Sequence, residues 1–213
     1  MRYPNAFRGV RNFYLAELLG LISKAILILL LILLEINSAL SKHVFVAGLG
    51  AAAMLLGAAV LVLIAVGVFQ AAKDEPLFQK ARPAAIAAPA LAFLTLTVRE
   101  TGAVRDILSI ARDAASLWCV LCILKGILSL ARQLKKPEMV ERGKALYTVI
   151  LLAGAAGLLL DIVLAAIPEN TAAGSVVSMI LTLLYTILAV GESLLLYFYL
   201  RQTVRMLGNT KQK

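Results

Sequence analysis

Residues 116–167 read SLWCVLCILKGILSLARQLKKPEMVERGKALYTVILLAGAAGLLLDIVLAAI, two apolar segments on either side of a basic connection. Each segment is long enough to cross a hydrocarbon core of about 30 Å, which takes about 17 to 25 helical residues. Lys and Arg in short loops stay preferentially on the cytoplasmic side of a membrane. The hairpin therefore predicts a membrane-spanning fold and its orientation from its basic residues, Arg132, Lys135, Lys136, Arg142 and Lys144.

The composition indicates an integral membrane protein. Apolar residues make up 62% of the chain and charged residues 15%, with a mean hydropathy of +0.92, whereas a soluble domain carries about 25% charged residues. The net charge of +9 is interpreted as loop charge that faces the cytoplasm and the anionic lipid headgroups, so no nucleic-acid partner is expected. The two cysteines, both in one apolar segment, predict no disulfide framework.

We predict an all-α bundle of six transmembrane helices, with both termini in the cytoplasm of a bacterium and the bundle in its plasma membrane. The N-terminal segment, residues 1–13, is expected to lie at the headgroup level, because its aromatic residues share one helical face. A cleaved signal peptide is the rival interpretation, but no small-residue cleavage site follows the first apolar run. Residues 201–213 are expected to form a basic cytoplasmic tail. The expected spans are 14–34, 45–69, 83–98, 115–131, 146–167 and 176–200.

The third block, residues 83–98, decides the number of spans. It has only 16 residues, which is roughly 24 Å of helix, and it contains Pro89. If the block crosses, 15 loop Lys and Arg residues lie inside and 4 outside; if it does not, the counts are 9 and 10. Because loop Lys and Arg set the orientation, the first arrangement is favoured.

Two further segments have expected positions. Residues 99–114 repeat apolar side chains at helical spacing, which predicts either an amphipathic helix on the outer face or a protruding first part of the fourth span. The first half of the second span, AGLGAAAMLLGAA, carries small residues four apart, such as Ala53 and Gly57. Small residues let helix backbones approach closely in lipid, so this span is expected to be central.

Ionisable residues inside the spans are the strongest indication of function. Each costs about 2.5 to 3.5 kcal/mol at mid-bilayer and therefore tends to face protein or water. By depth, Lys24, Lys125 and Glu192 share a layer near the cytoplasmic side, and Glu192 is expected to be the counter-ion of one of the lysines. Tyr185 and Thr182 lie on the same polar stripe as Glu192.

The functional interpretation is a polar cavity bordered by these five residues that binds an ion or a small polar solute. The structural alternative is an ion pair in which a lysine extends to the headgroups. Asp161 lies near the outer surface as a second charged site, and its expected partner is Arg99, Arg105 or its own loop.

Cys119 and Cys122 form a CVLC sequence at the outer end of the fourth span, one turn apart. The segment WCVLCILK resembles the membrane oxidoreductases of the disulfide-forming DsbB family, in which such a pair at the edge of a helix passes electrons to a quinone. The resemblance implies a possible redox pair. That family also uses a second cysteine pair in an outer loop, and this chain has no further cysteine. A buried free cysteine also occurs simply as a small apolar residue.

Motifs for hydrolytic, nucleotide-dependent or metal chemistry were not found in the sequence, so no metal site and no cofactor are expected. The segments FRGVRNFYLAELL and FQAAKDEPLFQKA are similar to small multi-pass proteins of Firmicutes-type bacteria, and the size and topology resemble substrate-binding subunits of energy-coupling-factor transporters. The leading hypothesis is a small solute-binding or transport component, or a membrane subunit that contacts other subunits or copies of itself. The alternatives are a membrane scaffold or assembly factor and a thiol oxidoreductase.

Overall fold

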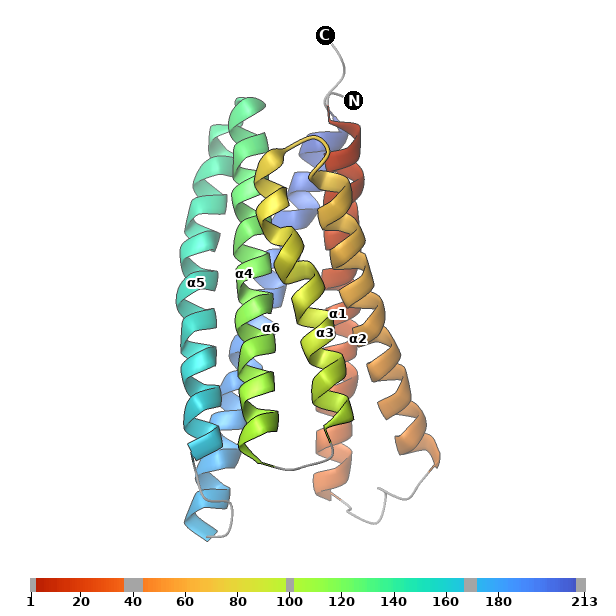
Figure 1. Ribbon diagram of the computed structural model, residues 1–213, viewed down its shortest axis with the longest axis vertical. Helices are drawn as coiled ribbons and strands as arrows, with labels where there is room; N and C mark the ends of the chain where they lie inside the picture. The colour runs from red at the N-terminus through yellow and green to blue at the C-terminus, as the bar shows by residue number, and fades with distance from the viewer. Residues whose placement is uncertain (1–2, 37–43, 99–101, 167–171, 210–213) are drawn as a thin grey trace.

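The computed structural model describes residues 3–36, 44–98, 102–166 and 172–209. They form six α-helices and one short 3-10 helix (Figure 1). Their bounds are α1 Pro4–Ile36, α2 Val44–Ala71, η2 Pro76–Ala81, α3 Arg82–Thr97, α4 Ala103–Gln133, α5 Pro137–Ala166 and α6 Ala172–Gly208. The all-α fold is as expected.

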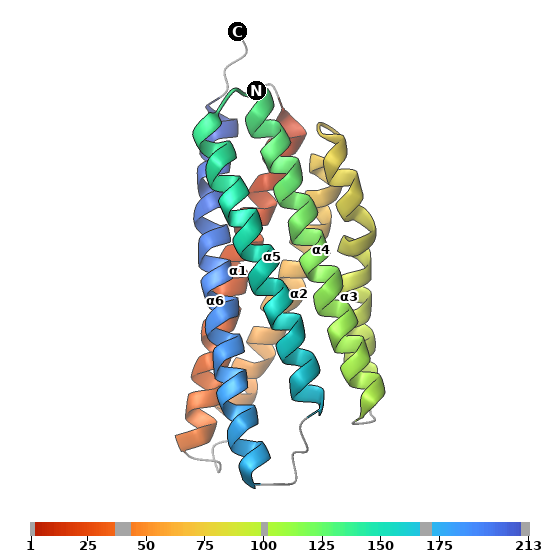
Figure 2. The same ribbon diagram turned by 90° about the vertical axis from the view of Figure 1, so that its left-hand side faces the viewer.

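The helices form a closed ring in which neighbours in sequence are neighbours in space. Each helix contacts the next one along the chain, and α6 contacts α1. Both termini lie at one end of the bundle, called the terminal end below, and the opposite end is called the far end (Figures 1 and 2). Short connections between long antiparallel helices favour this order, because each helix packs first against its neighbour in the chain.

Five of the helices, all except α3, are long and apolar enough to cross a membrane. Large apolar side chains cover the outside of the ring, as in Leu55, Phe93, Leu152 and Leu183, which suits contact with lipid. Helix α3 has 16 residues with Pro89 inside and lies beside α2 and α4 (Figure 1). The chain is therefore a polytopic bundle with five membrane-length apolar helices.

Two segments expected outside the spans continue the helices. Most of the N-terminal segment belongs to α1, where Ala6 and Val10 are completely buried instead of facing the headgroups. Residues 103–114 form the first part of α4, the second of the two arrangements that the sequence allowed. The start of the C-terminal tail likewise belongs to α6, in which Thr203 and Leu207 are buried.

Helix α4 is the central helix of the bundle, not α2 as the small residues suggested. In its apolar window 56% of the residues are buried, against 11% to 17% in the other four membrane-length helices. Among the described residues, a methyl group added to Gly48, Gly50 or Gly57 would have no atom within 4 Å. Of this stretch Ala53 is buried, and its carbonyl accepts a hydrogen bond from Ser23 of α1. The close approach of α1 and α2 occurs nearer the terminal end, where Gly9 faces the backbone of Gly67.

Aromatic packing closes the terminal end. The 3-10 helix η2 places the Phe78 side chain, fully buried, inside the ring, with its ring centroid 6.1 Å from that of Phe13. Gly126 of α4 makes room for it, because a Cβ there would lie 2.7 Å from the Phe78 ring. The sequence analysis treated this segment as a loop, since the pattern PLFQKA is too short to show a buried face.

Two local features fix the connections at the terminal end. Asp74 accepts hydrogen bonds from the backbone N–H groups of Asn5 and Ala6, at 2.7 and 2.8 Å, and so caps the first turn of α1. Lys135, between α4 and α5, has a φ of 53°, and the N–H of Lys136 donates to the carbonyl of Ala131. Lys135 therefore occupies the left-handed position of a Schellman motif that ends α4, and the bond from Lys136 to Ala131 is the long hydrogen bond of that motif. Glycine is the usual residue at the left-handed position.

Candidate functional site

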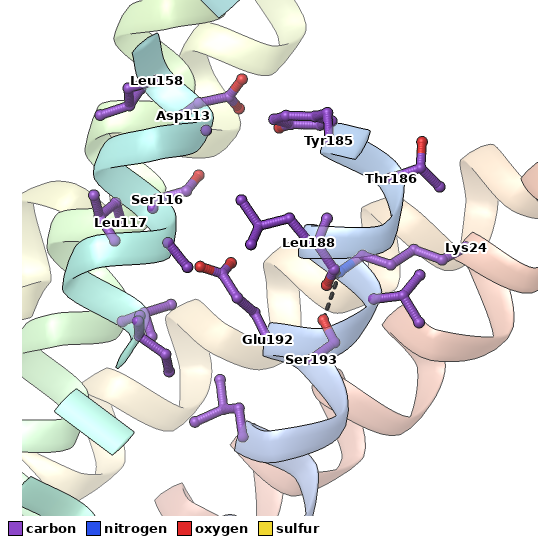
Figure 3. A pocket seen from close by; sticks show the side chains of 18 of the residues that line it. Lys24, Asp113, Ser116, Leu117, Leu158, Tyr185, Thr186, Leu188, Glu192 and Ser193 are labelled. Carbon is purple, nitrogen blue, oxygen red and sulfur yellow. Dashed lines mark hydrogen bonds between the residues drawn. The ribbon is translucent and has the colours of Figure 1, made fainter. Parts of the chain in front are cut away.

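A cavity of about 480 Å³ lies inside the ring among α1, α4, α5 and α6, and along α1 it extends from Glu17 to Leu31. Most of its wall is apolar. Polar side chains enter it from all four helices (Figure 3). They are Glu17 and Lys24 of α1, Asp113 and Ser116 of α4, Asp161 of α5, and Tyr185, Thr186, Glu192 and Ser193 of α6.

Lys24 connects α1 to the neighbouring helix α6. Its Nζ donates to the carbonyl of Ala189 at 3.0 Å and to the hydroxyl of Ser193. The Glu17 carboxyl lines the same cavity and attracts the Lys24 ammonium electrostatically. Because Glu17 and Lys24 are seven residues apart, two helical turns, they lie on one face of α1.

Glu192 does not pair directly with Lys24. Lys24 approaches α6 from the α1 side, whereas the carboxyl of Glu192 points into the space between α6 and the helices α4 and α5 (Figure 3). Its Oε1 atom is buried and has no hydrogen-bond partner among the described residues. The expected contact between Glu192 and a lysine is thus replaced by longer-range attraction, since both Glu17 and Glu192 act electrostatically on Lys24.

A second polar group lies toward the far end of the cavity. Arg112 holds Asp113 with two hydrogen bonds, at 2.8 and 2.9 Å, in the one ion pair found within the described ranges. Asp161 lies beside Asp113, and its buried Oδ2 has no partner in the described part of the chain. The residue near Asp161 is therefore Arg112, not Arg105; Arg99 and the loop 167–171 lie outside the described residues.

Glycines shape the wall between α5 and its neighbours. A Cβ at Gly154 would lie 2.4 Å from the Leu117 side chain, so α4 and α5 can approach closely only without one. At Gly157 the nearest atom is on the Tyr185 ring, at 3.5 Å. The face of α5 that carries Gly154, Gly157 and Asp161 therefore packs against α4 and α6, and it adjoins the cavity.

Two of the five residues expected to border a common cavity lie elsewhere. Lys125 is exposed on the outside of α4, with its Nζ 5.3 Å from the centroid of the Tyr147 ring. Thr182 is exposed, and its carbonyl accepts a hydrogen bond from Thr186. The structure brings together Lys24, Tyr185 and Glu192.

The sequence analysis overlooked Glu17 and Asp113. Glu17 lies within the first expected span and two turns from Lys24, so the spacing could have revealed it. Asp113 falls in residues 99–114, whose apolar side chains at helical spacing predicted either an outer amphipathic helix or the start of the fourth span, so it was not recognised as a residue of the cavity. Ser193, next to Glu192, carried no distinguishing pattern.

The cysteines are away from the cavity. Cys119 and Cys122 are free and buried, and the Sγ of Cys119 lies 4.0 Å from the carbonyl of Ala81. Neither side chain lines the cavity. Their packing is that of small apolar residues in the contact between α4 and the η2–α3 segment.

Comparisons with protein-family models, with curated proteins and with solved structures gave no match. The resemblances drawn from short segments therefore assign no family.

Proposed function

We propose that this chain is a six-span plasma-membrane protein that binds a small solute in the cavity, as a transport component or as the solute-binding subunit of a larger assembly. The observation that supports it is the cavity itself, in which ionisable side chains from four helices face a common space. Such groups are costly in a bilayer and are retained mainly where they face protein or water. A cavity of this size is typical of sites for small molecules.

The charge distribution supports cytoplasmic termini. Both termini lie at one end of the bundle (Figure 1), and the helix ends and connections there carry most of the basic residues. Among the described residues outside the cavity, the far end offers Arg105 and the already paired Arg112. The positive-inside rule then assigns the terminal end to the cytoplasm, provided that α3 crosses. The basic residues of the terminal end are Arg8, Arg11, Lys73, Lys80, Arg82, Arg132, Lys135, Lys136, Arg142, Lys144, Arg201 and Arg205.

A scaffold or assembly factor is the second candidate. The observation that favours it is an open glycine face of α2, where Gly50 and Gly57, seven residues apart, have no neighbour within 4 Å among the described residues. A helix from another subunit, or from a second copy of this chain, could pack closely there. The two candidate functions make different predictions about the cavity. Solute binding requires the cavity to be open to water, whereas a scaffold role does not.

Cysteine accessibility in proteoliposomes tests the proposed function. In a background with Cys119 and Cys122 replaced by alanine, Ser116→Cys places one thiol in the cavity wall, and Leu152→Cys places one on the outer apolar face, where Leu152 is 66% exposed. A water-soluble maleimide requires thiolate, which forms in water and not in lipid. We expect Ser116→Cys to react and Leu152→Cys to react only after denaturation in detergent.

The opposite result would favour the scaffold. If the thiol of Ser116→Cys stays unreactive in the folded protein and reacts after denaturation, the space around it is closed to water. The proposal of solute binding is then withdrawn.

A further inference from the structure

Two carboxyl groups of the cavity each have a buried oxygen without a hydrogen-bond donor among the described residues, whereas the nearby cations have acceptors. Glu192 Oε1 and Asp161 Oδ2 are buried and have no hydrogen-bond partner among the described residues. By contrast, Lys24 donates to Ala189 and Ser193, and Arg112 donates to Asp113. Because buried polar atoms are nearly always hydrogen-bonded, the two free acceptors indicate that something which donates hydrogen bonds belongs in the cavity.

The charges of the cavity wall have a negative balance. Four carboxyl side chains line it, those of Glu17, Asp113, Asp161 and Glu192, against the single ammonium of Lys24. Arg112 compensates Asp113 directly. Two negative charges facing the cavity therefore have no cation beside them, and between apolar walls their field is weakly screened.

The geometry favours an organic cation over a metal ion held by side chains. In the described residues no three His, Cys, Asp or Glu side chains come close enough to hold one metal ion, whereas hard cations take six or more oxygen ligands. The remaining wall is largely apolar, with Leu117, Leu158 and Leu188 around the space and the Tyr185 ring at its edge (Figure 3). An aromatic face also attracts a cation.

From these observations we infer that the cavity recognises a primary ammonium group carried on a small apolar body. The N–H groups donate to Glu192, and the apolar part lies against the leucines. This inference rests on the proposed function, because it names the class of solute for the same cavity.

Three solutes of one shape and different charge test the inference. They are 2-phenylethylammonium, 2-phenylethanol and 3-phenylpropionate, each titrated against the purified full-length protein in detergent, with thermal stabilisation and calorimetry as readouts. We expect the cation to bind at least about tenfold more tightly than the alcohol, and the anion not to bind. Glu192→Gln should remove the preference for the cation, and Glu192→Asp should retain it. Glu141→Gln, an exposed position of α5, is the matched control.

A second measurement does not depend on the apolar body of the probe. On Ser116→Cys, a trimethylammonium methanethiosulfonate should react about tenfold faster or more than the sulfonate analogue, after correction for their rates with a free thiol. Glu192→Gln should reduce this ratio, while Glu141→Gln should leave it unchanged. Both reagents report on the folded protein, so a loss of either rate without a change in their ratio indicates a general loss of access.

The outcomes separate the two proposals. Equal binding of the three solutes together with equal reagent rates overturns the ammonium inference and leaves a solute-binding cavity in place. Reaction of Ser116→Cys with maleimide but no preference for the cationic reagent does the same. Absence of any reaction at Ser116→Cys overturns the proposed function itself.

Discussion

Replacing Gly126 by alanine tests the packing at the terminal end. An added Cβ would lie 2.7 to 2.8 Å from three atoms of the Phe78 ring, which has no exposed surface and contacts Phe13. A real Cβ keeps a distance several tenths of an ångström longer from such atoms. The buried Phe78 ring is rigid, so it cannot move away as the end of a flexible side chain could. Overpacking of this kind costs about 1 to 3 kcal/mol.

A second effect has the opposite sign. Alanine stabilises a helix interior by up to about 1 kcal/mol relative to glycine, so the observed change is the difference between the two. Gly57→Ala measures the helix-propensity effect alone, because Gly57 also lies inside a helix and a Cβ there would have no described atom within 4 Å. The packing cost alone is the stability of Gly57→Ala minus that of Gly126→Ala, each relative to the wild type.

The assay is reversible unfolding of the purified protein in mixed detergent micelles, followed by circular dichroism and by the melting temperature. We expect Gly126→Ala to be less stable than Gly57→Ala by about 1 to 3 kcal/mol. The double variant Phe78→Leu with Gly126→Ala should be more stable than the sum of its single effects, since the smaller side chain removes the clash. Equal stability of the two alanine variants would refute the packing described for Phe78.

Three further predictions concern two connections at the terminal end and the proposed topology. Lys135→Gly should stabilise the protein by about 1 kcal/mol, because a φ of 53° is unfavourable for a residue with a Cβ. Lys136→Gly is the control, because it removes the same charge at a position without this strain. An equal gain in stability from Lys136→Gly in thermal unfolding would contradict the reasoning. Asp74→Ala should cost about 1 to 2 kcal/mol of unfolding free energy, because it leaves two N–H groups of α1 without their acceptor, whereas Lys73→Ala should have little effect in the same assay. In intact cells, a membrane-impermeant thiol reagent should label Lys42→Cys and not Lys136→Cys in the cysteine-free background; labelling of Lys136→Cys would invert the proposed topology.

The fold was largely predictable because each long apolar helix is encoded by one continuous segment of the sequence. Each apolar run of about 20 residues predicts one helix, and short connections make consecutive helices neighbours. The extent of the helices was less predictable: α1 begins at Pro4 and α4 at Ala103, because a helix continues into amphipathic segments that hydropathy alone does not assign to a span.

The site was predictable only in part, since it depends on which faces meet across the ring. Lys24, Tyr185 and Glu192 were expected to share a cavity, and they do line one. Lys125 shares their depth but lies on the outer side of α4, and depth along a helix says nothing about rotation around it. The position of Phe78 required knowledge of the gap left by Gly126, a contact between residues far apart in the sequence.

The Asp74 cap has a mechanical consequence for α1. This carboxylate ties the first turn of α1 to the turn that precedes η2, and the same helix carries Glu17 and Lys24 into the cavity three to five turns further on. An α-helix is stiff along its axis, so an axial displacement of α1 at Lys24 is transmitted to its first turn almost undiminished. The turn and Phe78 would move with it, so α1 mechanically connects the cavity to the aromatic closure at the terminal end.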